Sequence, residues 1–354
     1  MLDQTLTEAD SDAAGITLPV AKEPTARDWV DLLHDYRKPD PTRGLLELVV
    51  TIGPLLVLWG LTYAAFLVSF WLALLVAVPA GGFLVRLFLI QHDCGHGSFF
   101  RKRVTNDWIG RVLGVLTMTP YDMWKRSHAV HHATSGNLDH RGIGDIYTLT
   151  VAEYNALSRW GRFRYRLYRH PIVMFGLGPA YVFLLQNRLP FGYMKAGSIY
   201  WISTMGTNLG IIAFAGVMIW LVGAQAFLMV HLPIVLIAAT IGIWLFYIQH
   251  QFEDAHWETE ESWNVHEAAL HGSSHYDLPG ALRWLTANIG IHHVHHLCSR
   301  IPYYRLNDVL KAYPELKDVH RITLWESFQY AGLQLWDAKQ KRLVSFRDAR
   351  VAIS

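Results

Sequence analysis

Charged side chains are scarce in this chain. Only 17% of its 354 residues are Asp, Glu, Lys or Arg, and 52% are hydrophobic. A soluble protein usually carries about 25% charged residues, so the deficit indicates a surface that faces lipid. The same apolar excess excludes a disordered chain, because disordered sequences contain too few apolar residues to form a core.

Cysteine is scarcer still, with two residues. Two thiols cannot form a disulfide framework or a four-thiolate zinc or iron–sulfur site, and their scarcity fits a reducing compartment. A basic excess is also missing, because the formal net charge is +2. Nucleic acid is therefore not expected as a partner, since neutralising its phosphates needs clustered basic residues.

Two long segments contain no charged residue at all. The first runs from Leu48 to Val85 and the second from Ala196 to Phe252. A helix needs about 20 apolar residues to cross a bilayer, so each segment has the length of two spans joined by a tight turn. Buried helices of soluble proteins seldom keep more than about 14 apolar residues in a row. We expect spans at about residues 46–67, 69–91, 201–222 and 227–249.

Positive charge gathers between these two segments, where residues 91–195 hold 14 Lys and Arg against 6 Asp and Glu. The positive-inside rule places this region in the cytoplasm, and two hairpins return the chain to that side each time. Both termini are then cytoplasmic, and the inner membrane of a bacterium is the expected location. Two shorter apolar stretches, at 112–120 and 171–185, are expected to lie on the membrane surface as interfacial helices.

The predicted fold class is all-α, a polytopic integral membrane protein with four transmembrane helices in two hairpins and a cytoplasmic helical cap. Residues 1–44 are expected to form a polar, disordered N-terminal tail. Residues 45–310 form the membrane domain. Residues 311–354, of ordinary mixed composition, are expected to form a helical cytoplasmic segment.

Histidine, by contrast, is unusually common, with 19 residues. Residues three or four apart share one face of a helix, so a cluster with this spacing presents its imidazoles to one point. The number of clustered imidazoles exceeds what one zinc ion binds and suits two ions, and imidazole favours iron, copper, zinc or nickel over magnesium or calcium. A di-iron centre fits best, although spacing alone does not separate iron from zinc. The clustered residues are His92, His96, His128, His131, His132, His292, His295 and His296.

Two familiar metal motifs are incomplete. His266 and Glu267 begin a zincin-like motif, but Leu270 stands where its second histidine belongs. The single Glu-x-x-His, from Glu253 to His256, has no second copy, whereas carboxylate di-iron bundles use two.

Three segments resemble the histidine boxes of the membrane-bound fatty acid desaturase family. They are HDCGHGSFF at 92–100, HAVHH at 128–132 and HHVHHLCSRIPYYRL at 292–306. Their order, their spacing and their placement relative to the two hairpins agree with the family over roughly residues 45–310. The third box and NLDHRGIGDIYTLT at 137–150 are most similar to bacterial omega-6 or delta-12 acyl-lipid desaturases.

The resemblance implies that the eight clustered histidines bind two iron ions, and that His250, just after the fourth span, is a ninth ligand. His275 is a candidate tenth ligand or an outer supporting residue, whereas His293 occupies a variable position of the third box and is not expected to bind iron. Asp93 and Asp139 are candidates for orienting imidazoles, with helix capping and surface solvation as the alternatives. The other histidines are expected to be solvated or structural: His140, His170, His256, His266, His271 and His320.

The resemblance further implies an enzyme that uses two iron ions and O2 to introduce a cis double bond into the acyl chain of a lipid. Two electrons would come from a separate donor, ferredoxin or cytochrome b5, because the chain has no GxGxxG after a strand, no CxxC and no HPGG. Candidates for lining an acyl tunnel, or alternatively for anchoring the chain at the membrane surface, are Trp124, Trp257, Trp263 and Trp284.

Two alternatives stay open at this point. One is another enzyme of the same superfamily: a fatty acid or lipid hydroxylase, or a carotenoid ketolase or hydroxylase. The more distant one is a non-catalytic membrane metal-binding or transport protein. Transport requires polar residues within the spans, and only His231 stands out there.

Overall fold

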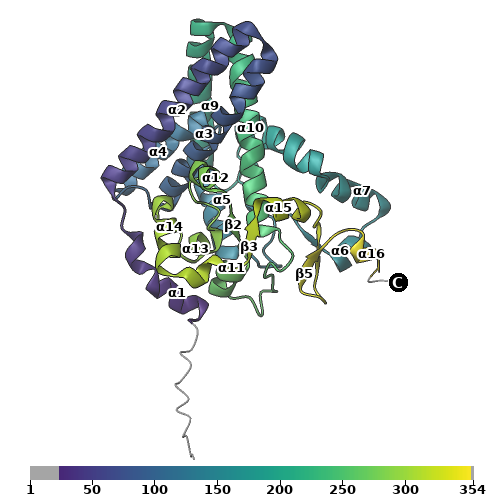
Figure 1. The fold of residues 1–354 in the computed structure, drawn as a ribbon. Helices are drawn as coiled ribbons and strands as arrows, with labels where there is room; N and C mark the ends of the chain where they lie inside the picture. Colours follow the sequence, from purple (N-terminus) through teal and green to yellow (C-terminus); the bar gives the residue numbers. More distant parts are fainter. Residues whose placement is uncertain (1–23, 352–354) are drawn as a thin grey trace, which may run out of the picture.

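The computed structural model describes residues 24–351. Its four longest helices, all long and apolar enough to cross a membrane, form one bundle that rises above the rest of the protein (Figure 1). This confirms the predicted four spans in two hairpins. The helices are α2 (Pro41–Val68), α3 (Phe70–His96), α9 (Ser198–Val222) and α10 (Ala224–His250).

The helices are longer than the spans predicted from hydropathy, because their ends include polar residues that lie outside the apolar segments. Helix α2 begins earlier, where the Asp40 side chain accepts hydrogen bonds from two backbone N–H groups of the first turn. Helix α3 continues through His96 and ends at Gly97, whose left-handed φ of 69° stops the helix. Helix α10 likewise continues to His250. The long helices therefore carry histidines out of the apolar bundle.

Helices α3 and α10 form the inside of the bundle. In the most apolar window of each helix, 61% of α3 and 39% of α10 is buried, compared with 17% of α2 and 6% of α9. The outer helices expose large apolar side chains such as Leu56 and Trp220, at 67% and 82% of their surface. An apolar surface of this extent is unfavourable in water and suits contact with lipid tails.

Shorter helices form a cap below the bundle and a set of elements at its side (Figure 1). Helix α4 (Arg103–Leu116) lies beside the bundle, against α3 and α9. The cap helices are α5 (Tyr121–Thr134), α11 (Val265–His271), α12 (Gly280–Leu285), α13 (His292–Leu297) and α14 (Tyr303–Ala312). At the side lie α6 (Val151–Ala156), α7 (Arg159–Tyr168), α8 (Gly178–Leu184), α15 (Leu324–Tyr330) and α16 (Asp348–Val351). The described part of the chain is thus mainly helical, as predicted.

The C-terminal segment differs from the helical prediction, because it also contains three short strands. Strand β4 (Leu335–Asp337) pairs antiparallel with β5 (Arg342–Val344) and parallel with β1 (Leu149–Thr150). Strand β3 (Arg321–Thr323) pairs parallel with β2 (His275–Asp277). Strands of two or three residues are too short to be predicted from β-propensity. They form here because neighbouring elements pack on them.

The N-terminal region also differs from the predicted tail. Residues 1–23 lie outside the described part, but helix α1 (Ala26–Leu32) follows them and begins with a capping box of Thr25 and Asp28. Trp29 is buried and its ring packs edge-on against Tyr313, with centroids 5.3 Å apart. The second part of the predicted tail therefore packs onto the cap, although its polar composition conceals this apolar anchor.

The two stretches predicted as interfacial helices are helical at least in part. Residues 112–120 include the end of α4, and residues 171–185 include a π-helical turn and α8. Val104, Trp108 and Val112 are exposed on one face of α4, four residues apart. Such a stripe suits a membrane surface, and the location of these helices at the membrane stays a prediction.

Candidate metal centre

Four helices converge just below the membrane bundle and bring all nine predicted ligands together. Helix α3 supplies two histidines from its last two turns, α10 supplies its last residue, and α5 and α13 supply three each. The nine imidazoles form two groups, and within each group one ring nitrogen per residue lies within 4.8 Å of the others.

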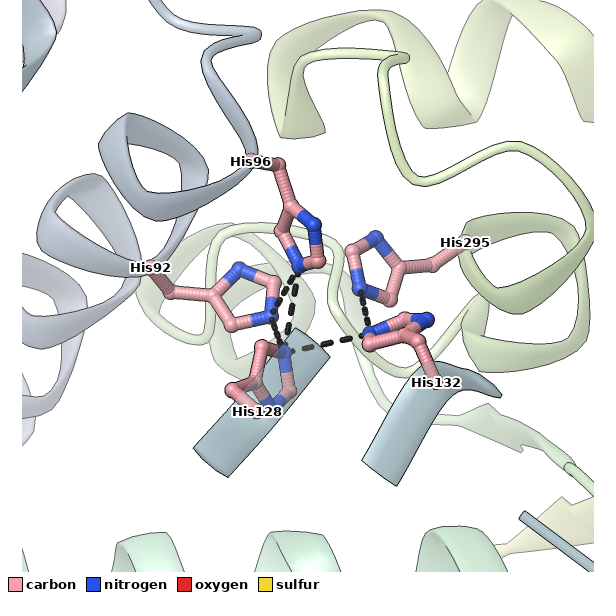
Figure 2. Close-up of side chains that lie close together, drawn as sticks. All are labelled: His92, His96, His128, His132 and His295. Atoms are coloured by element: carbon pink, nitrogen blue, oxygen red, sulfur yellow. Dashed lines mark hydrogen bonds between the residues drawn. The ribbon is translucent and has the colours of Figure 1, made fainter. Parts of the chain in front are cut away.

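The first group contains five imidazoles, and Figure 2 shows their ring nitrogens turned toward a common point. His128 Nε2 lies 3.0 Å from His92 Nε2 and 3.1 Å from His96 Nε2. His132 Nε2 lies 3.1 Å from His128 Nε2 and 3.2 Å from His295 Nε2. Five nitrogen donors around one point can hold one transition-metal ion.

The second group contains His131, His250, His292 and His296. The Nε2 atom of His250 lies 3.2 Å from that of His131 and 3.0 Å from that of His292. The two rings of α13 in this group are 3.1 Å apart at Nε2. All four side chains are buried. Four nitrogens in this arrangement can hold a second ion.

Helical spacing explains how two helices serve both groups. On α5, His128 and His132 are four residues apart and enter the first group, whereas His131 lies around the helix and enters the second. On α13, His292 and His296 enter the second group and His295 the first. Since residues four apart share a face and their neighbours point to another side, each helix presents ligands to two adjacent points.

Outer hydrogen bonds fix the tautomer of several rings. His250 Nδ1 lies 3.3 Å from the Gly272 carbonyl oxygen, which only accepts hydrogen bonds. His131 Nδ1 is hydrogen-bonded to the Asp145 carboxylate. In their neutral form both rings then carry the proton on Nδ1, and the facing Nε2 atoms, 3.2 Å apart, each present a lone pair. Two buried lone pairs at this distance repel each other, and a cation between them removes the repulsion. The residues present thus fit a metal ion.

Burial favours the ligand form of the imidazoles outside the spans. It lowers the pKa of His128, His132, His292, His295 and His296 well below the usual value, because a charged ring would lose its hydration. Neutral imidazole is the form that binds metal.

Of the two predicted orienting carboxylates, only Asp93 reaches the centre. Its Oδ1 atom lies 3.1 Å from His92 Nδ1, and its Oδ2 atom accepts a hydrogen bond of 2.7 Å from the Tyr303 backbone N–H. Asp139 instead accepts a hydrogen bond of 2.8 Å from the backbone N–H of Glu260 and is bonded to no imidazole in the described residues. Asp139 is exposed, in agreement with the alternative that it is solvated at the surface.

Asp145 is the orienting carboxylate that sequence reasoning missed. It lies outside the boxes, in the loop after α5, and reaches His131 because that loop passes unusually close to the helix. Gly144 has a left-handed φ of 73°, and a Cβ there would lie 3.1 Å from the His131 Cβ. The only signal in the sequence for this contact was the pair Gly142 and Gly144 directly before Asp145, which indicates a tight turn. No spacing rule links such a turn to a histidine.

The structure places His275 and His293 outside both groups. His275 Nδ1 is 2.6 Å from the Lys317 carbonyl oxygen, and His293 Nε2 is 2.8 Å from that of Leu316. Both rings are buried and hold the short 3-10 turn Pro314–Lys317 against the centre. Neither residue belongs to the two groups. For His293 this agrees with the prediction that it does not bind iron.

The remaining histidines also stay away from the centre. His256, His271 and His320 line a surface pocket that includes Glu258. His140 lies near Glu260, and His170 is exposed. His266 is only partly buried, in the first turn of α11.

Two of the four tryptophans considered for an acyl tunnel adjoin the centre. The Trp124 ring stacks on His128 with centroids 4.6 Å apart. Trp257 lines a small cavity beside His250 and Asp145. The other two serve elsewhere: Trp263 donates a hydrogen bond to a backbone carbonyl, and Trp284 is partly exposed. An acyl tunnel lined by these residues stays a prediction.

Comparison with known proteins agrees with this geometry. The sequence profile of the fatty acid desaturase family matches residues 69–328, which include α3 of the first hairpin, the whole second hairpin and all nine histidines. A Bacillus subtilis protein described as "Fatty acid desaturase" is 48% identical over 312 residues, which cover 88% of each chain.

More distant relatives have more detailed descriptions. A Synechocystis "sn-1 acyl-lipid omega-3 desaturase (ferredoxin)" is 26% identical over 318 residues, covering 86% of this chain and 82% of the relative. An Anabaena variabilis "sn-1 oleoyl-lipid 12-desaturase" is 25% identical over 306 residues, covering 78% and 76%. The chain therefore belongs to the fatty acid desaturase family of membrane oxidoreductases.

Proposed function

We propose that this protein is an acyl-lipid desaturase whose nine clustered histidines bind two iron ions. The observation that carries the proposal is the set of Nε2 atoms facing one another at 3.0–3.3 Å in two adjacent groups. Bound iron would supply the redox chemistry that activates O2 against an unreactive C–H bond, which no side chain can provide.

The net reaction sets what the protein must arrange. Two adjacent methylenes lose two hydrogen atoms, O2 takes two electrons from the substrate and two from a donor, and two protons complete two molecules of water. The chain's own part is to hold nine imidazoles in place around the two ions. Six of the nine are buried, and the carboxylates of Asp93 and Asp145 orient two of the rings.

The position of the centre supports a lipid substrate. The first group begins at the end of α3 and the second includes the end of α10, so both lie at the mouth of the bundle. A centre at this place adjoins the apolar helices that would contact the acyl chains of the bilayer. We further propose a separate electron donor, with ferredoxin first and cytochrome b5 second, since one relative is described with ferredoxin.

The distribution of charge supports the orientation. The segment between the hairpins carries 14 Lys and Arg against 6 acids over residues 91–195, and the centre lies on that same side. We therefore place the iron site and both termini in the cytoplasm, with the bundle in the inner membrane of a bacterium.

The test combines lipid analysis with metal analysis. The wild-type chain expressed in a host that lacks polyunsaturated lipids should produce new double bonds, located by gas chromatography and mass spectrometry of derivatives. His131→Ala should abolish them and lower the iron content of the purified protein, whereas His170→Ala, at an exposed histidine, should change neither. New hydroxyl groups in place of double bonds would point to a hydroxylase. Full activity of the His131 variant would refute the ligand assignment.

A further inference from the structure

A buried ionic cluster lies where the membrane helices meet the cap. Glu47 of α2 and Arg86 of α3 form an ion pair, and both side chains are almost fully buried, at 2% and 1% exposure. Burying two charges is unfavourable unless further hydrogen bonds satisfy them. A pair retained at this depth therefore needs a structural or functional reason.

The partners of this pair connect three parts of the chain. Arg86 donates hydrogen bonds to the Thr51 hydroxyl at 3.1 Å and to the Trp284 carbonyl oxygen of α12. The Tyr303 hydroxyl donates to Glu47 Oε2 at 3.1 Å. Arg86 thus holds α12, and Glu47 holds the first residue of α14.

Helices α12 and α14 enclose α13 in the sequence, and α13 supplies three of the nine imidazoles. The ionic cluster is thereby attached to both sides of the segment that carries these ligands. Membrane helix α3 provides two further ligands to the first group. The same buried pair therefore links the two sources of ligands that lie farthest apart in the sequence.

Tyr303 also contacts the ligand shell directly through its backbone. Its N–H is one of the free donors at the start of α14, and it donates to Asp93 Oδ2 at 2.7 Å. The other oxygen of Asp93 accepts from His92 Nδ1 at 3.1 Å. A continuous chain of hydrogen bonds runs from Glu47 through Tyr303 and Asp93 to His92.

We propose that Tyr303, anchored by the Glu47–Arg86 pair, is a positioning residue that sets the orientation of His92 and the register of α13 against α3. The inference rests on the proposed iron centre. Losing the hydroxyl anchor lets the start of α14 shift, and Asp93 and His92 shift with it. The Tyr303 hydroxyl contacts Glu47 and no imidazole, so Tyr303→Phe removes the anchor and leaves the backbone bond to Asp93 in place.

The test is the pair of variants Tyr303→Phe and Tyr304→Phe. Both remove one hydroxyl at the start of α14, but the Tyr304 hydroxyl bonds to the Asp40 backbone, accepting from its N–H at 2.9 Å and donating to its carbonyl oxygen at 3.4 Å, and it has no hydrogen bond to Asp93. Tyr303→Phe should lower kcat about 10-fold with an unchanged KM for the lipid, at the lower end of the range of about 10–100-fold that is usual for outer partners of metal ligands. Tyr304→Phe should behave as wild type.

A second readout does not depend on turnover. In protein loaded with iron-57, Tyr303→Phe should broaden or split the Mössbauer doublet of the iron at the first group, and Tyr304→Phe should not. The double variant with Glu47→Ala should be no worse than Glu47→Ala alone, since that substitution already removes the acceptor of the Tyr303 hydroxyl. A wild-type spectrum and kcat for Tyr303→Phe, or equal losses in both tyrosine variants, would overturn the inference. Absence of iron from the wild type would instead refute the proposed function.

Discussion

Asp145 offers the sharpest test of how the protein holds its proposed metal ligands. Its carboxylate is only 13% exposed and binds Nδ1 of His131, which is fully buried. A hydrogen bond to a charged group contributes about 1.5–3 kcal/mol, and each factor of ten in affinity is about 1.4 kcal/mol. Asp145→Ala should therefore weaken iron binding by about 10–100-fold, the range usual for outer partners of metal ligands.

Asp145→Asn should lose less, because its amide oxygen can still accept the hydrogen bond from His131. The control is Asp139→Asn, which removes a carboxylate from the same loop region but touches no imidazole in the described residues. The assay is iron per protein after dialysis against a graded series of chelator concentrations, with double bonds formed per cell as a second readout. Equal iron retention in Asp145→Ala and the wild type, or an equal loss in Asp139→Asn, would refute the reasoning.

Three further predictions follow from the contacts described above. Gly144→Ala should lower iron content as Asp145 variants do, because its Cβ would press on His131 at 3.1 Å and a φ of 73° strains alanine; unaltered iron binding would contradict this. Trp29→Ala should reduce the free energy of unfolding by about 3–5 kcal/mol and so lower the thermal midpoint in detergent, while iron per folded protein stays constant; an unchanged midpoint would show that α1 adds no stability. Arg141 holds the pKa of Glu153 at about 2, below its usual 4.5. Because the folded-state pKa is depressed, the stabilisation is present above about pH 4.5 and is lost as the pH falls toward 2; since the carboxylate is 42% exposed, its size is reduced by solvent screening. Thermal melts of Glu153→Gln and the wild type should therefore converge over that pH range, and a constant difference would contradict the assignment.

Family membership narrows the alternatives that the sequence left open. A non-catalytic transporter does not fit a chain that is 48% identical to a protein described as a fatty acid desaturase over most of its length. Hydroxylation and desaturation share their ligands, so the products named above distinguish them.

The sequence by itself determined the architecture of four membrane helices and the histidine clusters. Four spans follow from uninterrupted apolar length, because a bilayer offers no partners for exposed backbone and so requires helices of a fixed span. The pairing of His128 with His132, and of His292 with His296, follows from helical periodicity. These are local properties, and neighbouring residues are enough to reveal them.

Only the tertiary structure decided which histidines share a group, and what supports them. His250 joins His131 across 119 residues, and Asp93 joins Tyr303 across 210. The contribution of Asp145, the buried Glu47–Arg86 pair and the packing of α1 depend on contacts between distant segments. Such contacts arise from the way helices meet, which composition and periodicity do not record.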